Sequence, residues 1–161
     1  MRTKSLKILI FTLLSFFNYA QQEFAEIELI DFNTSVTYGS GSSVSVHFNP
    51  KGIFKFDNEI DDNQFFLELS DADGTFPVSP TILSTVDGFY TTTLNGILPS
   101  STSGNYRLRV RASKGLTGYN PPVNPNDAPT PIYDNILSTA TGVFVVNSVN
   151  NTTPVTIYSA I

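Results

Sequence analysis

The segment "NYRLRVRA", residues 105–112, constrains the fold of this chain more than any other stretch. Its apolar residues occupy every second position: Tyr106, Leu108 and Val110. Its arginines occupy the positions between them: Arg107, Arg109 and Arg111. Because successive side chains of a strand point to opposite faces, this period of two predicts a β-strand with one face in a core and the arginines toward solvent.

Further segments after residue 20 carry strand patterns: 26–30, 43–48, 63–70, 89–96 and 142–147. Turn sequences rich in Gly, Pro, Asn, Asp and Ser separate them. No stretch of ten or more residues there combines a helical period with helix caps. Short strands separated by turns at this spacing predict an all-β fold, namely a β-sandwich.

The first twenty residues, 1–20, have the pattern of a secretory signal peptide. Arg2, Lys4 and Lys7 form a basic start, an apolar run covers 8–17, and Ala20 is a small residue at the expected cleavage site. The apolar run is too short to span a bilayer comfortably. We therefore expect cleavage after Ala20 and a location outside the cell, secreted or at the cell surface. The alternative is a buried N-terminal helix.

Charge and cysteine content restrict the partners. The signal segment carries three of the nine basic residues and none of the fourteen acidic ones, so its removal leaves six against fourteen, a net charge of about −8. An acidic chain repels nucleic acid and anionic lipid, so we expect neither partner and no membrane insertion after cleavage. The chain has no cysteine, which excludes disulfides, thiolate metal sites and a lipid-modified cysteine.

The position of Tyr106 predicts a particular kind of sandwich. In immunoglobulin-like domains, a tyrosine near the start of strand F bonds back to the backbone, two residues before a core position that is cysteine in antibodies. Leu108 would occupy that core position here. We therefore predict an immunoglobulin-like Greek-key β-sandwich, in which Tyr106, Leu108 and Val110 are structural. The alternative is an ordinary inward-facing tyrosine.

We expect one domain over 21–148. Its segment at about 114–141 is rich in Pro and Asn, and we expect a long loop there between the last two strands. The residues 149–161 include an alternating apolar stretch with no turn after it. They indicate a linker or the start of a further module, and so a chain that is cut off.

Several elements together resemble the Ig-like modules near the start of large surface proteins of gliding, Bacteroidota-type bacteria: "GSSVSVHF", "FFLELSDADGTF", "PTIL", "LNGILP" and "GNYRLRVRAS". The resemblance implies an adhesin-like surface or secreted protein, associated with gliding motility and exported by the type IX secretion system. Family members carry a C-terminal sorting domain. The sequence up to Ile161 contains none, which fits either a cut-off chain or another export route.

Catalysis is not expected. His47 is the only histidine and lies on the outward face of a predicted strand, between Val46 and Phe48. No nucleophile-elbow motif Gly-x-Ser-x-Gly is present, and nothing in the sequence marks two acids as a glycosidase pair.

No cofactor is expected, with calcium as the one candidate. Carboxylates cluster in two predicted loops: Asp57, Asp61, Asp62, Asp71 and Asp73. Calcium prefers such oxygen ligands, often from aspartates at alternate positions. "DADG", residues 71–74, also fits a tight hairpin turn, and "DNEIDD", residues 57–62, also fits a solvated loop.

Two groups of residues are candidates for ligand binding. Tyr119 and Tyr133 lie in the Pro-rich segment, where prolines reduce the entropy lost on binding, although both could simply pin that segment to the sandwich. Arg107, Arg109 and Arg111 could bind an anionic partner such as an acidic polysaccharide. The interpretation that the alternation favours is a solvated face of the strand, whose pairs with Glu68 are worth about 0.2–1 kcal/mol each.

The resulting functional hypothesis is a non-catalytic extracellular adhesion or spacer module of a multidomain bacterial surface protein. Its partners would be a surface polysaccharide or protein and the neighbouring modules of its own chain. The alternative hypothesis is a carbohydrate-binding accessory module of an exported hydrolase.

Overall fold

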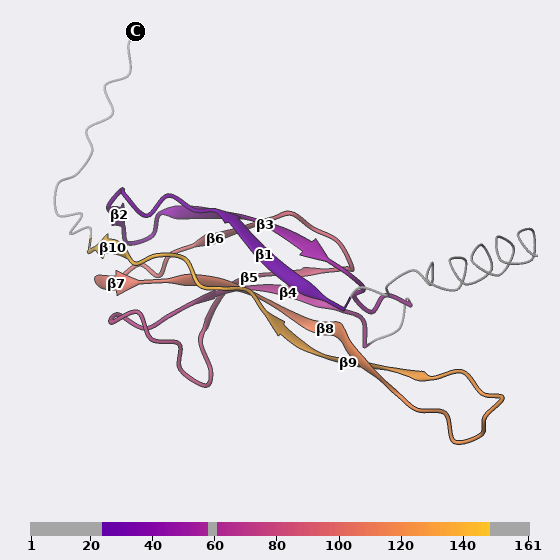
Figure 1. Ribbon diagram of the computed structural model, residues 1–161. Coiled ribbons are helices and arrows are strands. Elements are labelled where there is room, and N and C mark those ends of the chain that lie inside the picture. Colours follow the sequence, from indigo (N-terminus) through magenta and orange to yellow (C-terminus); the bar gives the residue numbers. More distant parts are fainter. Residues whose placement is uncertain (1–23, 58–60, 149–161) are drawn as a thin grey trace, which may run out of the picture.

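The computed structural model describes residues 24–57 and 61–148, so the predicted signal peptide and the segment after residue 148 lie outside the described residues. The described residues form strands and no helix, which confirms the all-β prediction (Figure 1). The strands are β1 (Glu26–Asp31), β2 (Tyr38–Gly39), β3 (Ser43–Lys51), β4 (Gln64–Leu69), β5 (Thr81–Asp87), β6 (Thr93–Ile97), β7 (Gly104–Tyr106), β8 (Leu108–Asn120), β9 (Thr130–Leu137) and β10 (Phe144–Asn147). Within the described ranges, no helix is long and apolar enough to cross a membrane.

The strands form three sheets, arranged in layers as in a β-sandwich (Figure 1). One sheet has the order β1-β3-β6, the second β5-β4-β8-β9 and the third β2-β10-β7. The pairing of β10 with β2 is parallel, and the other pairings are antiparallel. Only Arg107 separates β7 from β8, so the second and third sheets share one long strand.

The core lies between the layers and follows from the alternation in the sequence. Fully buried apolar side chains come from β3, β4 and β8: Val46, Phe48, Phe65, Leu67, Leu108 and Val110. Phe48 and Phe65 pack from opposite layers with ring centroids 5.6 Å apart. Each strand therefore places one face in the core and leaves the other for surface contacts.

Tyr106 is the last residue of β7, just before β8, and is buried, with 6% of its surface exposed. Its hydroxyl donates to the backbone carbonyl of Ser103 over a long 3.5 Å contact. Its ring lies against Phe144 of β10, at 6.4 Å between centroids. The tyrosine thus packs in the core and also contacts the turn that precedes its own strand.

The strands β8 and β9 form a long hairpin that projects beyond the end of the sandwich (Figure 1). This corrects the predicted loop at about 114–141, because only 121–129 and 138–143 lie outside strands. The loop interpretation gave weight to the Pro and Asn content. It overlooked apolar residues that the backbone pairing buries, including Leu116, which is 1% exposed.

The hairpin is anchored where it leaves the sandwich. The Ala25 amide donates to the Leu116 carbonyl at 2.8 Å, and the Leu116 amide donates to the Ile53 carbonyl at 2.9 Å. A Cβ on Gly115 would lie 2.6 Å from the Ala25 Cβ and would also collide with Ile136. Glycine at position 115 therefore permits the close approach that fixes the direction of the hairpin.

Candidate functional site

The outer face of the β5-β4-β8-β9 sheet carries the predicted arginines. The strand register pairs Glu68 of β4 with Arg109 of β8, and Phe66 with Arg111. These pairs lie on the face opposite the core, because the intervening residues Leu67 and Val110 are fully buried inside. The orientation of the arginines is therefore the one that the alternation predicts.

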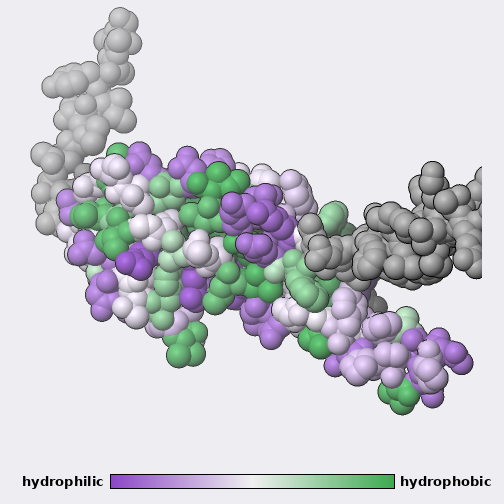
Figure 2. Space-filling model, viewed as in Figure 1, coloured by the Kyte–Doolittle hydropathy of each residue, from purple (hydrophilic) through white to green (hydrophobic). Residues whose placement is uncertain are grey.

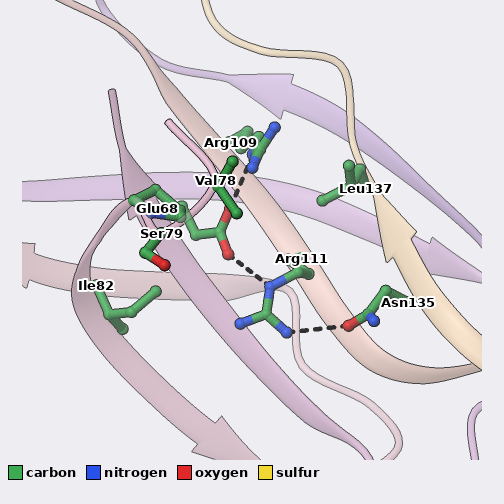
Figure 3. Close-up of a pocket in the computed structure, with 9 residues that line it drawn as sticks. Glu68, Val78, Ser79, Ile82, Arg109, Arg111, Asn135 and Leu137 are labelled. Atoms are coloured by element: carbon green, nitrogen blue, oxygen red, sulfur yellow. Dashed lines mark hydrogen bonds and ion pairs between the residues drawn. The ribbon is translucent and has the colours of Figure 1, made fainter. Parts of the chain in front are cut away.

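Glu68 is held by two of the arginines at once (Figure 3). The Arg109 Nε donates to Glu68 Oε2 at 2.8 Å, and the Arg111 Nε donates to Glu68 Oε1 at 2.5 Å. The Glu68 side chain is 1% exposed, and the two arginine side chains are 20% and 24% exposed. Two guanidinium groups facing one carboxylate leave a surplus positive charge at the edge of solvent.

Aromatic rings lie beneath both guanidinium groups. The Arg109 Cζ lies 4.2 Å from the centroid of the Phe76 ring, and the Arg111 Cζ lies 3.9 Å from that of Phe66. Arg111 also donates from Nη1 to Asn135 Oδ1 of β9 at 3.1 Å. Cation–π contacts and hydrogen bonds together restrict these side chains to one arrangement before any ligand arrives.

A hollow of about 520 Å³ opens beside this ion pair. Glu68, Arg109 and Arg111 form its floor, with further residues around them: Val78, Ser79, Pro80, Ile82, Asn135 and Leu137. Figure 3 shows Val78 beside Arg109, and Asn135 and Leu137 across the hollow on the neighbouring strand. Its size falls in the range of small-ligand sites in proteins, and its lining combines charge with aliphatic walls.

The predicted tyrosines continue the same face along the hairpin. Asn135 and Leu137 line the hollow, and alternation along β9 places Tyr133 and Pro131 on that face as well. Tyr119 is paired with Pro131 across the hairpin and so lies on this face too. Both tyrosines are half-buried. The structure thus brings the tyrosines and two of the arginines onto one elongated surface.

Arg107 lies apart from the hollow. Its side chain is exposed and close to the turn at 71–74, where a Cβ on Gly74 would lie 3.6 Å from the Arg107 Nε. Its backbone amide donates to the Ser70 hydroxyl at 2.9 Å. Of the three predicted arginines, Arg107 is therefore the one that does not line the cavity.

The first group of calcium candidates lies in the connection between β3 and β4. The Asp61 carboxylate contacts Lys114 Nζ at 2.9 Å and Lys55 Nζ at 3.4 Å. Lys55 also contacts Asp57 at 3.5 Å, and the Asp57 amide donates to Asp62 Oδ1 at 2.9 Å. Hydrogen bonds from Lys114 and then Lys55 lower the pKa of Asp61 below its ordinary value of 3.8. Lysines of the chain itself therefore already contact the carboxylates of Asp57 and Asp61.

The second group, Asp71 and Asp73, forms a turn. Both carboxylates accept a hydrogen bond from the Thr75 amide, at 2.8 and 2.9 Å. The Gly74 amide donates to the Asp71 carbonyl at 3.1 Å, and Gly74 has a φ of +86°, which favours glycine. The turn sits within a longer connection from β4 to β5, so it is not the tight hairpin that the sequence suggested.

The described residues contain no group of three or more His, Asp or Glu side chains arranged to hold a metal ion. His47 lies on the other sheet, where its Nδ1 is 3.0 Å from the Thr93 hydroxyl of β6. The predicted calcium and histidine residues are therefore spread over separate parts of the sandwich.

Sequence reasoning missed several residues of the hollow. Val78, Asn135 and Leu137 line it from the β4–β5 connection and from β9, and no local pattern marks them. Glu68 carried a signal, since it is a single acid within the apolar run of 65–69. Its partner residues, however, depend on pairing between strands far apart in the sequence.

Comparisons with protein-family models, with curated proteins and with solved structures found no match to this chain.

Proposed function

We propose that this chain is a non-catalytic extracellular module with an immunoglobulin-like fold, which serves adhesion or spacing in a larger bacterial surface protein. The observation that carries the proposal is the elongated outer face of the β5-β4-β8-β9 sheet. This face combines the hollow above Glu68, two fixed arginines and a projecting hairpin with two tyrosines. Preorganised charge beside an open hollow favours recognition of a ligand.

The strand pairings support the immunoglobulin-like part of the proposal. The sheet β1-β3-β6 corresponds to strands A, B and E, and the sheet β5-β4-β8-β9 to strands C′, C, F and G. On this assignment β10 continues strand G, since it pairs with β7 just as β9 pairs with β8. The contact of the Tyr106 hydroxyl with Ser103, a few residues upstream, corresponds to the tyrosine corner of such domains.

The projecting hairpin supports a role at a surface. Its turn at 121–129 is exposed almost throughout, and Figure 2 shows that its protruding end is mostly hydrophilic. Prolines at positions such as 121 and 122 limit the conformations that such a turn can adopt. An element of this kind extends the reach of the module without requiring a large core.

The extracellular part rests on the signal-peptide pattern of residues 1–20 and on the acidic, cysteine-free composition. It is tested by expressing the full chain in a bacterial host and determining the N-terminus of the exported protein by mass spectrometry. A mature chain that begins at Gln21 supports the proposal. Retention of the intact N-terminus inside the cell contradicts it.

Adhesion is tested with the exported protein immobilised on beads and incubated with bacterial cells and with an array of surface polysaccharides. We expect retention of cells or of particular polysaccharides above that of beads carrying a denatured sample. No retention of either, by a protein that melts cooperatively, overturns an adhesive role and leaves only the spacer role.

The alternative, a carbohydrate-binding accessory module of an exported hydrolase, is favoured by one observation. Tyr119 and Tyr133 lie on the same face of the hairpin, where aromatic rings could contact sugars. The two functions are separated by the sequence of the gene beyond codon 161. Further repeats of this fold support adhesion, whereas a catalytic domain supports the accessory role.

A further inference from the structure

We propose that the outer face of the β5-β4-β8-β9 sheet binds an acidic polysaccharide, with a carboxylate of the ligand held by Arg109 and adjacent sugar rings lying on Tyr133 and Tyr119. The inference rests on the proposed adhesive function and specifies its ligand class. It extends from the hollow above Glu68 to the hairpin.

The charge balance of the hollow favours an anion. Both oxygens of Glu68 are occupied, one by Arg109 and one by Arg111. The Nε of Arg109 is used on Glu68, while its two terminal amino groups donate to no residue in the described part of the chain. A guanidinium fork with free donors matches a carboxylate in shape and charge.

The residues around the Arg109 guanidinium favour its attraction for an anion at this one place on the surface. Asp87 of β5, a carboxylate elsewhere on this sheet, accepts a hydrogen bond from Gln64 Nε2 at 2.7 Å. The guanidinium of Arg109 is also held over the Phe76 ring, so a ligand does not need to order it. Partial burial of the surplus charge strengthens its attraction for an anion compared with a fully solvated arginine.

The tyrosines favour a sugar polymer over a small anion. Asn135, Tyr133 and Pro131 follow one another on one face of β9, with about 7 Å between successive residues of this series. Tyr119 lies opposite Pro131, so the aromatic residues extend the surface away from the hollow. A ligand that uses both features must be an extended chain that carries carboxylates and presents ring faces. An acidic polysaccharide has both properties.

Aliphatic side chains complete the surface around the charge. Ile82 and Leu137 line the hollow and are 42% and 50% exposed, and Val78 is fully exposed at its rim. The C–H faces of pyranose rings can cover such side chains while the carboxylate remains on the arginine. The hollow therefore fits one charged sugar unit, with its neighbours on the hairpin.

The test uses isothermal titration of the mature protein with an oligosaccharide of hexuronic acids, in buffer with EDTA. A matched control ligand is the same oligosaccharide with its carboxyl groups reduced to hydroxymethyl groups. A hexapeptide of glutamate is the third ligand. We expect binding of the hexuronic acid oligosaccharide that weakens as salt is raised, and binding at least about tenfold weaker for the reduced form.

Three variants locate the binding. Arg109→Gln should weaken binding of the acidic oligosaccharide about tenfold, because a charged hydrogen bond is lost. Tyr133→Ala should weaken it as well, and this variant leaves the buried ion pair intact. Lys51→Gln removes the same charge from β3 in the other sheet and should bind like the wild type. A thermal melt shows whether each variant is folded, and Arg109→Lys replaces Arg109→Gln if the latter unfolds.

The outcomes separate this inference from the proposed function. Equal binding of the acidic and reduced oligosaccharides, or wild-type binding by Arg109→Gln and Tyr133→Ala, overturns the inference and leaves adhesion in place. Binding of the glutamate peptide alone also overturns it and points to a protein ligand. If neither these ligands nor any cell surface is bound, the adhesive function itself fails.

Discussion

Glu68 accepts a hydrogen bond from Arg109 at 2.8 Å across two paired strands, although the Glu68 side chain is 1% exposed and lies on the face away from the core. The carboxylate is thus buried by the residues that neutralise it. On the outer side of the sheet, the two arginine guanidinium groups lie between this carboxylate and the phenylalanine rings beneath them. Arg109 and Arg111 therefore do more than form a solvated face with weak surface ion pairs, because they share a buried carboxylate.

The first prediction concerns this carboxylate. Replacing Glu68 by Gln should lower the free energy of unfolding by about 3 kcal/mol, because two partly buried guanidinium groups lose their counter-charge. Urea denaturation measures the change. The control is Lys51→Gln, which breaks the solvent-exposed pair with Glu28 and should leave stability nearly unchanged. A Glu68→Gln protein as stable as this control would show that the buried pair contributes nothing measurable.

The second prediction concerns the base of the hairpin. Gly115→Ala should cost about 1–3 kcal/mol, since the added methyl group collides with Ala25 and Ile136. Gly118→Ala is the matched control on the same strand, because its Cβ would lie 3.7 Å from Ile132 Cδ1, an ordinary contact. Thermal denaturation of both proteins checks the difference. Equal melting temperatures would mean that the close approach at Gly115 is not maintained in solution.

The third prediction is a pH dependence. The pKa of Asp61 is lowered in the folded chain by Lys114 and Lys55, so its carboxylate stabilises the fold above the ordinary pKa of 3.8. That contribution is lost as the pH falls through the lowered folded value. We expect Asp61→Asn to melt below the wild type near neutral pH and the two curves to converge as the pH falls below 3.8. A difference that persists unchanged in strong acid would exclude this carboxylate as its cause. Added salt should reduce the difference near neutral pH.

The fourth prediction concerns calcium. Asp57 and Asp61 already contact lysines, and the carboxylates of Asp71 and Asp73 converge on the amide of Thr75. We therefore expect millimolar calcium to leave the melting temperature of the mature protein unchanged relative to a sample with EDTA. A rise in melting temperature would establish a calcium site. Loss of that rise in Asp71→Asn or in Asp57→Asn would locate the site in one loop or the other.

The hairpin and the arginines differ in how far they could be predicted. The alternation over 105–112 indicates both faces of β8, because the period of two is a local property of a strand. The continuation of β8 through 114–120 lacks that regularity. It contains two glycines and two register shifts relative to β9. The strand there is maintained by backbone pairing with β9, which the amino-acid composition does not reveal.

The sequence by itself determined which side chains point inward along β3, β4 and the first part of β8, residues 108–112, and where turns such as 71–74 fall, because both depend on residues adjacent in the chain. The tertiary structure decided that Glu68 meets two arginines, that Asn135 and Leu137 close one side of a hollow, and that Tyr133 continues its surface. These relationships depend on the register between β4, β8 and β9. Register is a non-local property that arises from packing two layers around one core.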